Sequence, residues 1–337
     1  MAPYDDRLQD IGEAGLLARI FRLLPPAGAG VVVGPGDDAA VLAGSGADAV
    51  VFSADAAVQG IHFDLALMSP ADVGWRLTCA NLSDLAAMGA TPWAAVITLA
   101  APGETPAAVV EGFYEGAAAL ARDAGLALVG GDVVGSASGL FFAMAVLGRA
   151  AGGKLLTRSG AVPGDCLMLS GEVGGSRAGL DILRRQGEAA AAAAEDAVAR
   201  YRRPTPRLAC GRSLLERGLA SAAIDTSDSL SESCAHLARM SGVGVVLDAA
   251  AIPIAAGARD VAASRGVDAL AYALAAGEDF ELLWSCPAVR AAEAVAAADA
   301  TGIGARVVGR IVEPARGLVL VRDGVERPLV PAGYVHF

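Results

Sequence analysis

Acidic side chains occur in this sequence at positions where a catalytic cation could bind. The most informative is Asp84, which interrupts a stretch of apolar residues at helical spacing from residue 71 to residue 88. We expect its carboxylate to be buried, and a buried carboxylate is unfavourable unless an arginine or a metal ion pairs with it. Because Lys154 is the only lysine of the chain, the partner of Asp84 should be an arginine or a metal ion.

Further acids follow predicted strands or glycine-rich turns. Asp37 and Asp38 come after a glycine-proline-glycine turn. Asp55 follows an apolar strand, and Asp132 follows a pair of glycines. Strand ends can bring such side chains to one cleft at a sheet edge. Because Mg²⁺ prefers oxygen ligands and is commonly held by carboxylates together with substrate phosphates, the acids predict a magnesium-dependent phosphate site. Without cations, the carboxylates would repel one another and their pKa values would rise.

Most of these acids also have a purely structural explanation. Asp37 with Asp38 is compatible with a solvated turn, and Asp132 with a hairpin turn. Asp225 and Asp228 suit the N-terminus of a helix, where negative charge is favourable. Only Asp84, inside the predicted helix, requires a counter-charge whether its role is structural or functional.

Composition narrows the class of protein. A length of 337 residues and a hydrophobic content of 54 % predict two globular domains. The formal net charge of −11 argues against a nucleic-acid partner, because phosphate backbones require a basic surface. The five cysteines are odd in number and far apart, which favours neither a disulfide framework nor a zinc site. Since no long apolar run and no signal-peptide pattern occur, we expect a cytoplasmic protein without a membrane partner.

Alternating strand and helix patterns indicate an α/β protein with mixed sheets. We expect a first domain over residues 1–149, with helices over 12–24, 71–88 and 106–124 and strands over 49–53, 93–100, 126–129 and 139–148. We expect a second domain over residues 150–337. Its predicted strands are 166–170, 222–225, 243–248, 280–285, 307–311 and 318–322, and its predicted helices are 177–186, 188–203, 207–217, 230–240 and 288–300.

The common nucleotide-binding motifs are absent from the sequence. It contains no Walker-type phosphate loop, no His-Arg-Asp kinase segment and no dinucleotide fingerprint. A nucleotide, if one binds, must therefore bind by another route.

Ordered motifs across nearly the whole chain resemble the thiamine-monophosphate kinase family of the aminoimidazole ribonucleotide synthetase-like superfamily. The matching segments are residues 36–40, 53–55, 60–63, 81–90, 130–132, 156–161, 224–228, 277–282 and 333–337. Segments 81–90 and 277–282 separate this family from its superfamily relatives. The resemblance implies a two-domain fold in a homodimer, with the N-terminal sheets forming a barrel across the dimer axis.

The resemblance also implies an activity: direct in-line transfer of the γ-phosphoryl group of ATP to thiamine monophosphate, which gives thiamine diphosphate. The acceptor phosphate is already ionised near neutral pH, so no general base is required. The main obstacle is repulsion between two polyanions, which positioning and charge neutralisation by Mg²⁺ would overcome.

Carried over position by position, the resemblance implies roles for individual residues. The implied magnesium ligands or their immediate neighbours are Asp38, Ser53, Ala54, Asp55, Asp84, Asp132, Asp225 and Asp228. The implied ATP contacts are Tyr114, Gly131, Asp132, Arg158 and Ser227, and the implied thiamine contacts are His62, Glu278 and Tyr334. Catalytic roles are implied for Asp84, Asp132, Asp228 and Arg158. Without the resemblance, Tyr114 would suit a core, His62 a loop and Tyr334 a tail on the surface.

Some positions depart from the family pattern. Ala54 stands where a hydroxyl residue is usual, and Ser229 stands where a glycine is common. After Asp132, the usual threonines and arginine are replaced by Val133, Val134 and Gly135. Two other functions therefore remain as alternatives: another ATP-dependent member of the superfamily that makes an acyl or seleno phosphate, and a nucleotide-binding protein without turnover.

Overall fold

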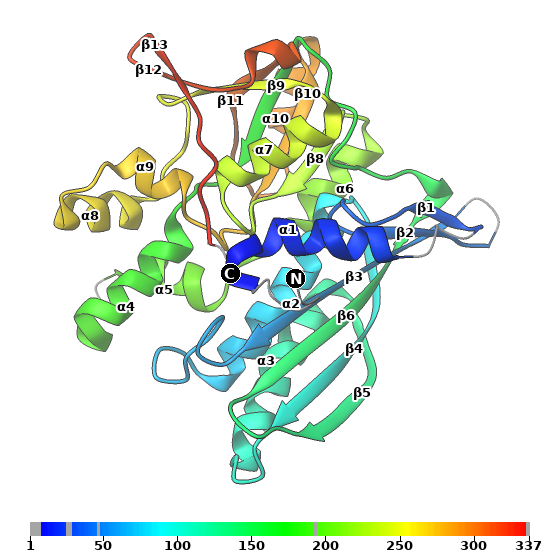
Figure 1. The fold of residues 1–337 in the computed structure, drawn as a ribbon, viewed down its shortest axis with the longest axis vertical. Coiled ribbons are helices and arrows are strands. Elements are labelled where there is room, and N and C mark those ends of the chain that lie inside the picture. The colour runs from blue at the N-terminus through cyan, green and yellow to red at the C-terminus, as the bar shows by residue number, and fades with distance from the viewer. Residues whose placement is uncertain (1–7, 25–28, 46–47, 192–193, 335–337) are drawn as a thin grey trace, which may run out of the picture.

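Two open sheets, each with its own helices, organise the chain (Figure 1). Residues 8–24, 29–45, 48–191 and 194–334 are described by the structure, a computed structural model. The N-terminal part contains α1 (Leu8–Leu23), β1 (Val31–Val33), β2 (Ala40–Ala43), β3 (Ala49–Val58), α2 (Pro70–Ala87), β4 (Thr91–Ala101), α3 (Ala107–Ala124), β5 (Ala127–Gly135) and β6 (Phe141–Ala150).

The C-terminal part begins after a short 3₁₀ turn that follows β6. It contains η1 (Ala151–Gly153), β7 (Asp165–Ser170), α4 (Gly175–Ala191), α5 (Glu195–Arg202), α6 (Leu208–Glu216), β8 (Ala222–Asp225), α7 (Leu230–Ser241), β9 (Gly244–Asp248), α8 (Ala256–Arg265), α9 (Ala269–Leu274), β10 (Leu282–Pro287), η3 (Ala288–Arg290), α10 (Ala291–Asp299), β11 (Ala305–Val312), η4 (Pro314–Arg316), β12 (Leu318–Arg322) and β13 (Val325–Pro328).

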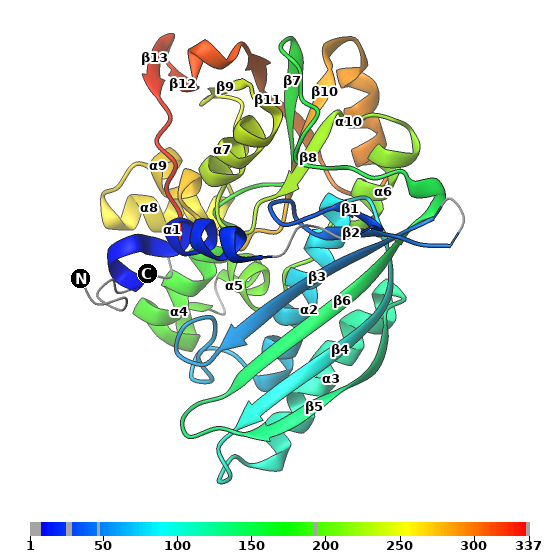
Figure 2. The same ribbon diagram turned by 45° about the vertical axis from the view of Figure 1, so that its right-hand side comes forward.

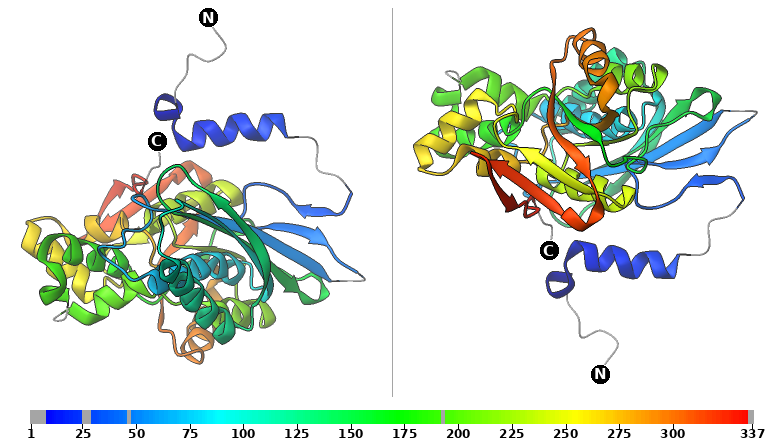
Figure 3. Two further views of the ribbon diagram at one scale, coloured as in Figure 1. Left: turned by 90° about the horizontal axis from the view of Figure 1, so that it is seen from below. Right: turned by 90° about the horizontal axis from the view of Figure 1, so that it is seen from above.

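The N-terminal sheet has the strand order β1-β2-β3-β6-β4-β5, in which only β4 and β5 pair in parallel. Helices α2 and α3 cover one of its faces, and Figure 2 shows the other face open. Strand β6 explains this arrangement, because Phe142, Met144 and Val146 are fully buried while the residues between them are only partly covered. Helix α1 lies outside both sheets and crosses in front of their junction (Figures 1 and 3).

Helix α2 is fixed in place at its start and along its length. Ser69 and Asp72 form a reciprocal capping box at its N-terminus. Glycines then let α2 and α3 approach closely: a Cβ on Gly74 would lie 1.9 Å from the carbonyl oxygen of Phe113, and a Cβ on Gly116 would lie 1.8 Å from that of Ala71. The close contact orients the opposite face of α2 toward the C-terminal part of the chain.

The C-terminal sheet has the order β13-β12-β9-β11-β7-β10-β8, in which β12 and β9 pair in parallel and the other neighbours are antiparallel. Strand β8 is one of the two edge strands, and it ends at Asp225 opposite Leu282 of β10. The chain turns there into α7, where the hydroxyl of Ser229 accepts a hydrogen bond from the N–H of Glu232. The end of β8 therefore points its acid toward the N-terminal part.

Local patterns located most elements but not their ends. Strand β3 continues past residue 53 and β5 past residue 129, so Asp55, Gly131 and Asp132 lie within strands and not after them. The prediction for Asp132 was wrong because paired glycines in an exposed edge strand resemble a turn. The predicted helix over residues 188–203 is divided between the end of α4 and α5. Strands β1, β2 and β13 and helices α8 and α9 were not predicted, because they are short or weakly patterned.

No helix in the described part of the chain combines the length and the apolar character needed to cross a bilayer. The cytoplasmic location stays a prediction, and so do the domain boundaries at residues 149 and 150.

Candidate functional site

A cavity of about 570 Å³ lies between the two parts of the chain. Helix α2 forms one wall with Arg76, Ala80 and Asp84, which are spaced four residues apart and therefore share a helical face. Strand β3 contributes Asp55, and the segment after β8 contributes Asp228. The cavity is thus built from residues of both parts and carries several acids.

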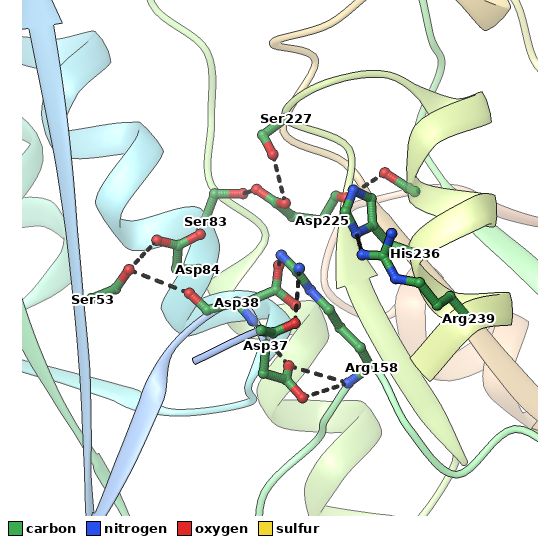
Figure 4. Close-up of polar contacts among 12 residues, drawn as sticks. Asp37, Asp38, Ser53, Ser83, Asp84, Arg158, Asp225, Ser227, His236 and Arg239 are labelled. Carbon is green, nitrogen blue, oxygen red and sulfur yellow. Dashed lines mark hydrogen bonds and ion pairs between the residues drawn. The ribbon is translucent and has the colours of Figure 1, made fainter. Parts of the chain in front are cut away.

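Three carboxylates converge beside this cavity. Asp38 precedes β2, Asp84 lies on α2 and Asp225 ends β8, and one ligand oxygen of each lies within 4.8 Å of the others. Figure 4 shows these side chains pointing toward one another from separate elements. The expected convergence of acids that are distant in sequence is therefore present for Asp38, Asp84 and Asp225.

The carboxylate of Asp84 is largely buried, as the helical pattern predicted, although it lies at the wall of the cavity. The face of α2 that carries Asp84 is open to the cavity, which the helical pattern alone could not show. The arginine of the cluster, Arg158, pairs with Asp38 and not with Asp84.

Serine hydroxyls hold the carboxylates in place. Ser53 donates a hydrogen bond to Oδ2 of Asp84 at 2.5 Å. Ser83 donates to Oδ2 of Asp225 at 2.6 Å, and Ser227 donates to Oδ1 of the same carboxylate at 3.0 Å. Each bond fixes a carboxylate without neutralising its charge.

Arg158 neutralises only part of the cluster. Its Nη2 lies 2.7 Å from Oδ1 of Asp38, and its backbone N–H donates to the carboxylate of Asp37 at 3.1 Å. Oδ2 of Asp38 is buried and has no hydrogen-bond partner among the residues that the structure describes. A buried carboxylate oxygen without a partner is costly, so this atom is a candidate ligand for a cation.

The electrostatic cost of assembling these acids appears in their pKa values. Burial raises the pKa of Asp38 to about 7, against the opposing effect of Arg158. Burial, followed by the charges of Asp225 and Asp228, raises the pKa of Asp55 to about 6. Burial and the neighbouring carboxylates likewise raise the pKa of Asp84 well above its usual range. A bound cation would relieve this repulsion.

Asp225 and Asp228 follow the same trend. Burial raises the pKa of Asp225, although the hydroxyls of Ser83 and Ser227 oppose the rise. Partial desolvation and the charge of Asp225 raise the pKa of Asp228 to about 6, although Asp228 keeps an exposed surface.

Within one chain, Asp132 is not brought to the acidic cluster. In the sheet register, Asp55 is opposite Met144, which is opposite Ile97, which is opposite Gly131. The neighbouring Asp132 therefore lies three strands from β3, about 14 Å away, and its side chain points to the open face of the sheet. Alternation along a strand also places the methyl group of Ala54 on that open face, so only its backbone carbonyl remains as a possible ligand.

Tyr114 is likewise outside the cavity. It lies on α3, where its ring contacts the ring of buried Phe113 edge-on at 5.5 Å. Its expected contact with ATP stays a prediction, and the alternative interpretation of a tyrosine packed on the core describes its position in this chain.

The three residues expected to contact thiamine all line the cavity. Nδ1 of His62 accepts a hydrogen bond from the N–H of Val58 at 3.1 Å. Glu278 forms an ion pair with Arg76 at 2.7 Å, and Tyr334 is 58 % exposed.

Sequence reasoning missed several residues of the site. Arg76 could have been found, because it lies eight residues before Asp84 on the same predicted helical face. Ser83 was inside the recognised segment, but its contact with Asp225 spans 142 residues of sequence and has no local signal. Tyr201, which also lines the cavity, comes from the predicted helix 188–203, to which the sequence pattern assigned no role in the site.

Comparisons with known proteins identify the family. The family model described as AIR synthase related protein, N-terminal domain, matches residues 36–150, and the corresponding C-terminal domain model matches residues 162–321. The thiamine-monophosphate kinase of Salmonella typhimurium is 35 % identical over 330 residues, covering 97 % of this chain and 98 % of that protein. The chain belongs to the thiamine-monophosphate kinase family.

Solved structures of this family share the fold. A structure of AaThiL complexed with AMPPCP and TMP has a TM-score of 0.86 and 28 % identity, covering 99 % of this chain and 100 % of that one. The thiamine-monophosphate kinase of Stenotrophomonas maltophilia K279a has a TM-score of 0.76 and 32 % identity, covering 94 % and 96 %. The predicted mixed α/β fold with two domains is thereby confirmed. The barrel across a dimer stays a prediction, because the N-terminal sheet of a single chain is open and does not test it.

Proposed function

We propose that this chain transfers the γ-phosphoryl group of ATP to the phosphate of thiamine monophosphate. The observation that carries the proposal is the convergence of Asp38, Asp84 and Asp225 beside a cavity that is also lined by the expected thiamine contacts. The similarity to AaThiL, which was complexed with TMP and the ATP analogue AMPPCP, supports the same pair of substrates.

Mg²⁺ fits the donor set of this site. The donors are carboxylate and hydroxyl oxygens, which hard cations prefer, and buried Oδ2 of Asp38 has no partner in the described part of the chain. Asp38, Asp84 and Asp225 would hold the ion, with Asp55 and Asp228 beside them. When bound, Mg²⁺ would supply positive charge against the phosphate oxygens.

The side chains of the site position the substrates. Ser53 and Ser83 keep two acids oriented, and Ser227 lies beside the cavity where it can reach a phosphate. Arg158 has a guanidinium group already directed into the cluster, and its planar fork suits phosphate oxygens. Because the acceptor oxygen is already ionised, the site needs alignment of acceptor and leaving group, not a proton-abstracting residue.

A homodimer belongs to the proposal. The open face of the N-terminal sheet carries exposed Phe52 and Val96, each 42 % exposed, among rows of alanines. Such an apolar sheet face favours cover by a second copy. Asp132 lies on this same open face, so any contact of Asp132 or Gly131 with ATP would be made across the dimer.

Coupled detection of ADP tests the proposal. Purified chain is mixed with ATP, Mg²⁺ and thiamine monophosphate, and D84N is compared with D260N, which replaces an exposed acid of α8. We expect ADP formation that requires thiamine monophosphate and Mg²⁺, is lost in D84N and persists in D260N. Binding of ATP without such turnover would instead support the nucleotide-binding alternative.

A further inference from the structure

Arg76 is a buried arginine in the wall of the cavity, and its contacts hold it firmly. It is 7 % exposed, and its Nη1 donates a hydrogen bond to the backbone carbonyl of Tyr201. Its guanidinium carbon lies 4.6 Å from the centroid of the Tyr201 ring, a cation–π contact. Its Nη2 lies 2.7 Å from Oε1 of Glu278. Arg76 therefore links α2 and the end of α5 to the loop that carries Glu278.

Glu278 is held in an unusual backbone conformation. Its φ is +62°, in a region that residues other than glycine rarely adopt. Its backbone N–H donates to the carbonyl of Ser227 at 2.6 Å. A Cβ on the preceding Gly277 would lie 2.5 Å from the carbonyl oxygen of Asp228, so this loop is pressed against the segment that carries site acids. Strain of this kind is typical of residues fixed for a function.

Only one oxygen of the Glu278 carboxylate is engaged. Oε1 pairs with Arg76, whereas the described residues supply no hydrogen bond to Oε2. The side chain is 42 % exposed and lines the cavity. Oε2 is therefore an acceptor available to a ligand, with its position set by the bond to the other oxygen.

The charge of the pair indicates which ligand group it suits. Arg76 and Glu278 together carry no net charge, so they favour a neutral N–H donor more than a cation. Arg76 lies eight residues from Asp84 along α2, about 12 Å. With the substrate phosphate at the acids, the rings of thiamine would extend toward this pair. The aminopyrimidine ring of thiamine carries a neutral amino group.

We propose that Arg76 is a positioning residue that holds Glu278 so that Oε2 accepts a hydrogen bond from the amino group of the substrate's pyrimidine. The inference rests on the proposed function. Its consequence is substrate specificity. In an analogue with an oxo group in place of the amino group, the oxo oxygen would face Oε2 of Glu278, and two acceptors cannot form a hydrogen bond. A site built to hydrogen-bond one group rejects such an analogue strongly, because its own polar atom is left unpaired.

The test compares thiamine monophosphate with its oxo analogue, oxythiamine monophosphate. We expect the wild-type chain to prefer the amino substrate by at least about 100-fold in kcat/KM. In E278Q the preference should fall below about tenfold, because the amide of glutamine can donate to the oxo group. R76M should raise KM for thiamine monophosphate at least about tenfold and lower the preference, with KM for ATP unchanged. The double variant should be no worse than the poorer single variant, because both changes remove the same contact.

Arg203 provides a matched control, because it also joins the end of α5 to α2 but lies outside the cavity. Its Nε lies 2.7 Å from Oδ1 of Asp72. R203M should leave both KM values and the preference within twofold of wild type. If R76M does not fold, E278Q alone still decides.

Three results would overturn the inference. One is an unchanged preference in E278Q. Another is an R76M variant in which kcat falls equally for both substrates while KM is unchanged. The third is a wild-type chain that forms no ADP with thiamine monophosphate, which would refute the proposed function itself and this inference with it.

Discussion

Replacing Asp55 by asparagine should stabilise the metal-free protein. Its carboxylate has a pKa of about 6 in the folded chain against an ordinary value of 3.8, so the folded state binds the proton more tightly than the unfolded state does. Ionised Asp55 therefore destabilises the folded state. This free-energy cost reaches its full value above pH 6 and vanishes below pH 3.8. The shift corresponds to about 3 kcal/mol at pH 8 and about 1 kcal/mol near pH 4.5.

Asparagine has nearly the same shape and no charge, so D55N should recover part of this free energy. We expect a gain of about 1 to 3 kcal/mol at pH 8, or about 1 to 4 °C in Tm for a chain of this size, and a gain reduced by about two thirds near pH 4.5.

The assay is thermal and urea unfolding of the wild-type chain and D55N in EDTA at both pH values. D260N is the control, because Asp260 is an exposed acid of α8 outside the site. Its unfolding should differ little from wild type at either pH. A D55N variant that is no more stable than wild type at pH 8, or whose gain is the same at both pH values, would refute the view that desolvation and like charge burden this cluster.

The remaining predictions concern Mg²⁺, Ser83, Arg158 and the open face of the N-terminal sheet. Mg²⁺ at about 100 times its Kd should stabilise the wild-type chain at pH 8 by about 2.7 kcal/mol, and D84N should lose most of this gain in the same unfolding assay. S83A removes a charge-assisted bond to buried Asp225, so calorimetry should show weaker Mg²⁺ binding and unfolding should show a loss of about 1.5 to 3 kcal/mol. R158M should raise KM for ATP more than KM for thiamine monophosphate in steady-state kinetics. V96D places a charge on the open sheet face and should yield a monomer in sedimentation velocity, whereas a wild-type monomer would contradict the proposed dimer.

Periodicity predicted the parts of the site that depend on one element. The helical pattern located α2 and marked Asp84 as exceptional, and the strand patterns placed Asp225 at the end of β8. These features depend on spacing over a few residues. The acids were expected to share a cleft. Asp55, Asp84, Asp225 and Asp228 line the cavity, and Asp38 meets Asp84 and Asp225 beside it.

The strand ends were predicted wrongly from the sequence. For this reason the sequence did not show on which face of the N-terminal sheet Asp132 lies. Extending β5 through two glycines puts Asp132 on the open face, three strands from Asp55, although both had been expected at one edge. Contacts between distant segments were equally out of reach. Arg76 donates to a carbonyl 125 residues away, and Ser83 donates to a carboxylate 142 residues away. Neither contact can be predicted from a local sequence pattern.

The partners of the acids explain why this cluster can remain available to a cation. An arginine on each carboxylate would remove the repulsion and also occupy the oxygens that a metal needs. A serine hydroxyl fixes the orientation of a carboxylate and leaves its charge intact, which is the arrangement at Asp84 and Asp225. Arg158 engages only one oxygen of Asp38, and no other described residue bonds to the second oxygen. The site thus keeps its negative charge at a cost in stability, and a bound cation would recover that cost. Stability and metal affinity should therefore change in opposite directions when Asp55 is neutralised.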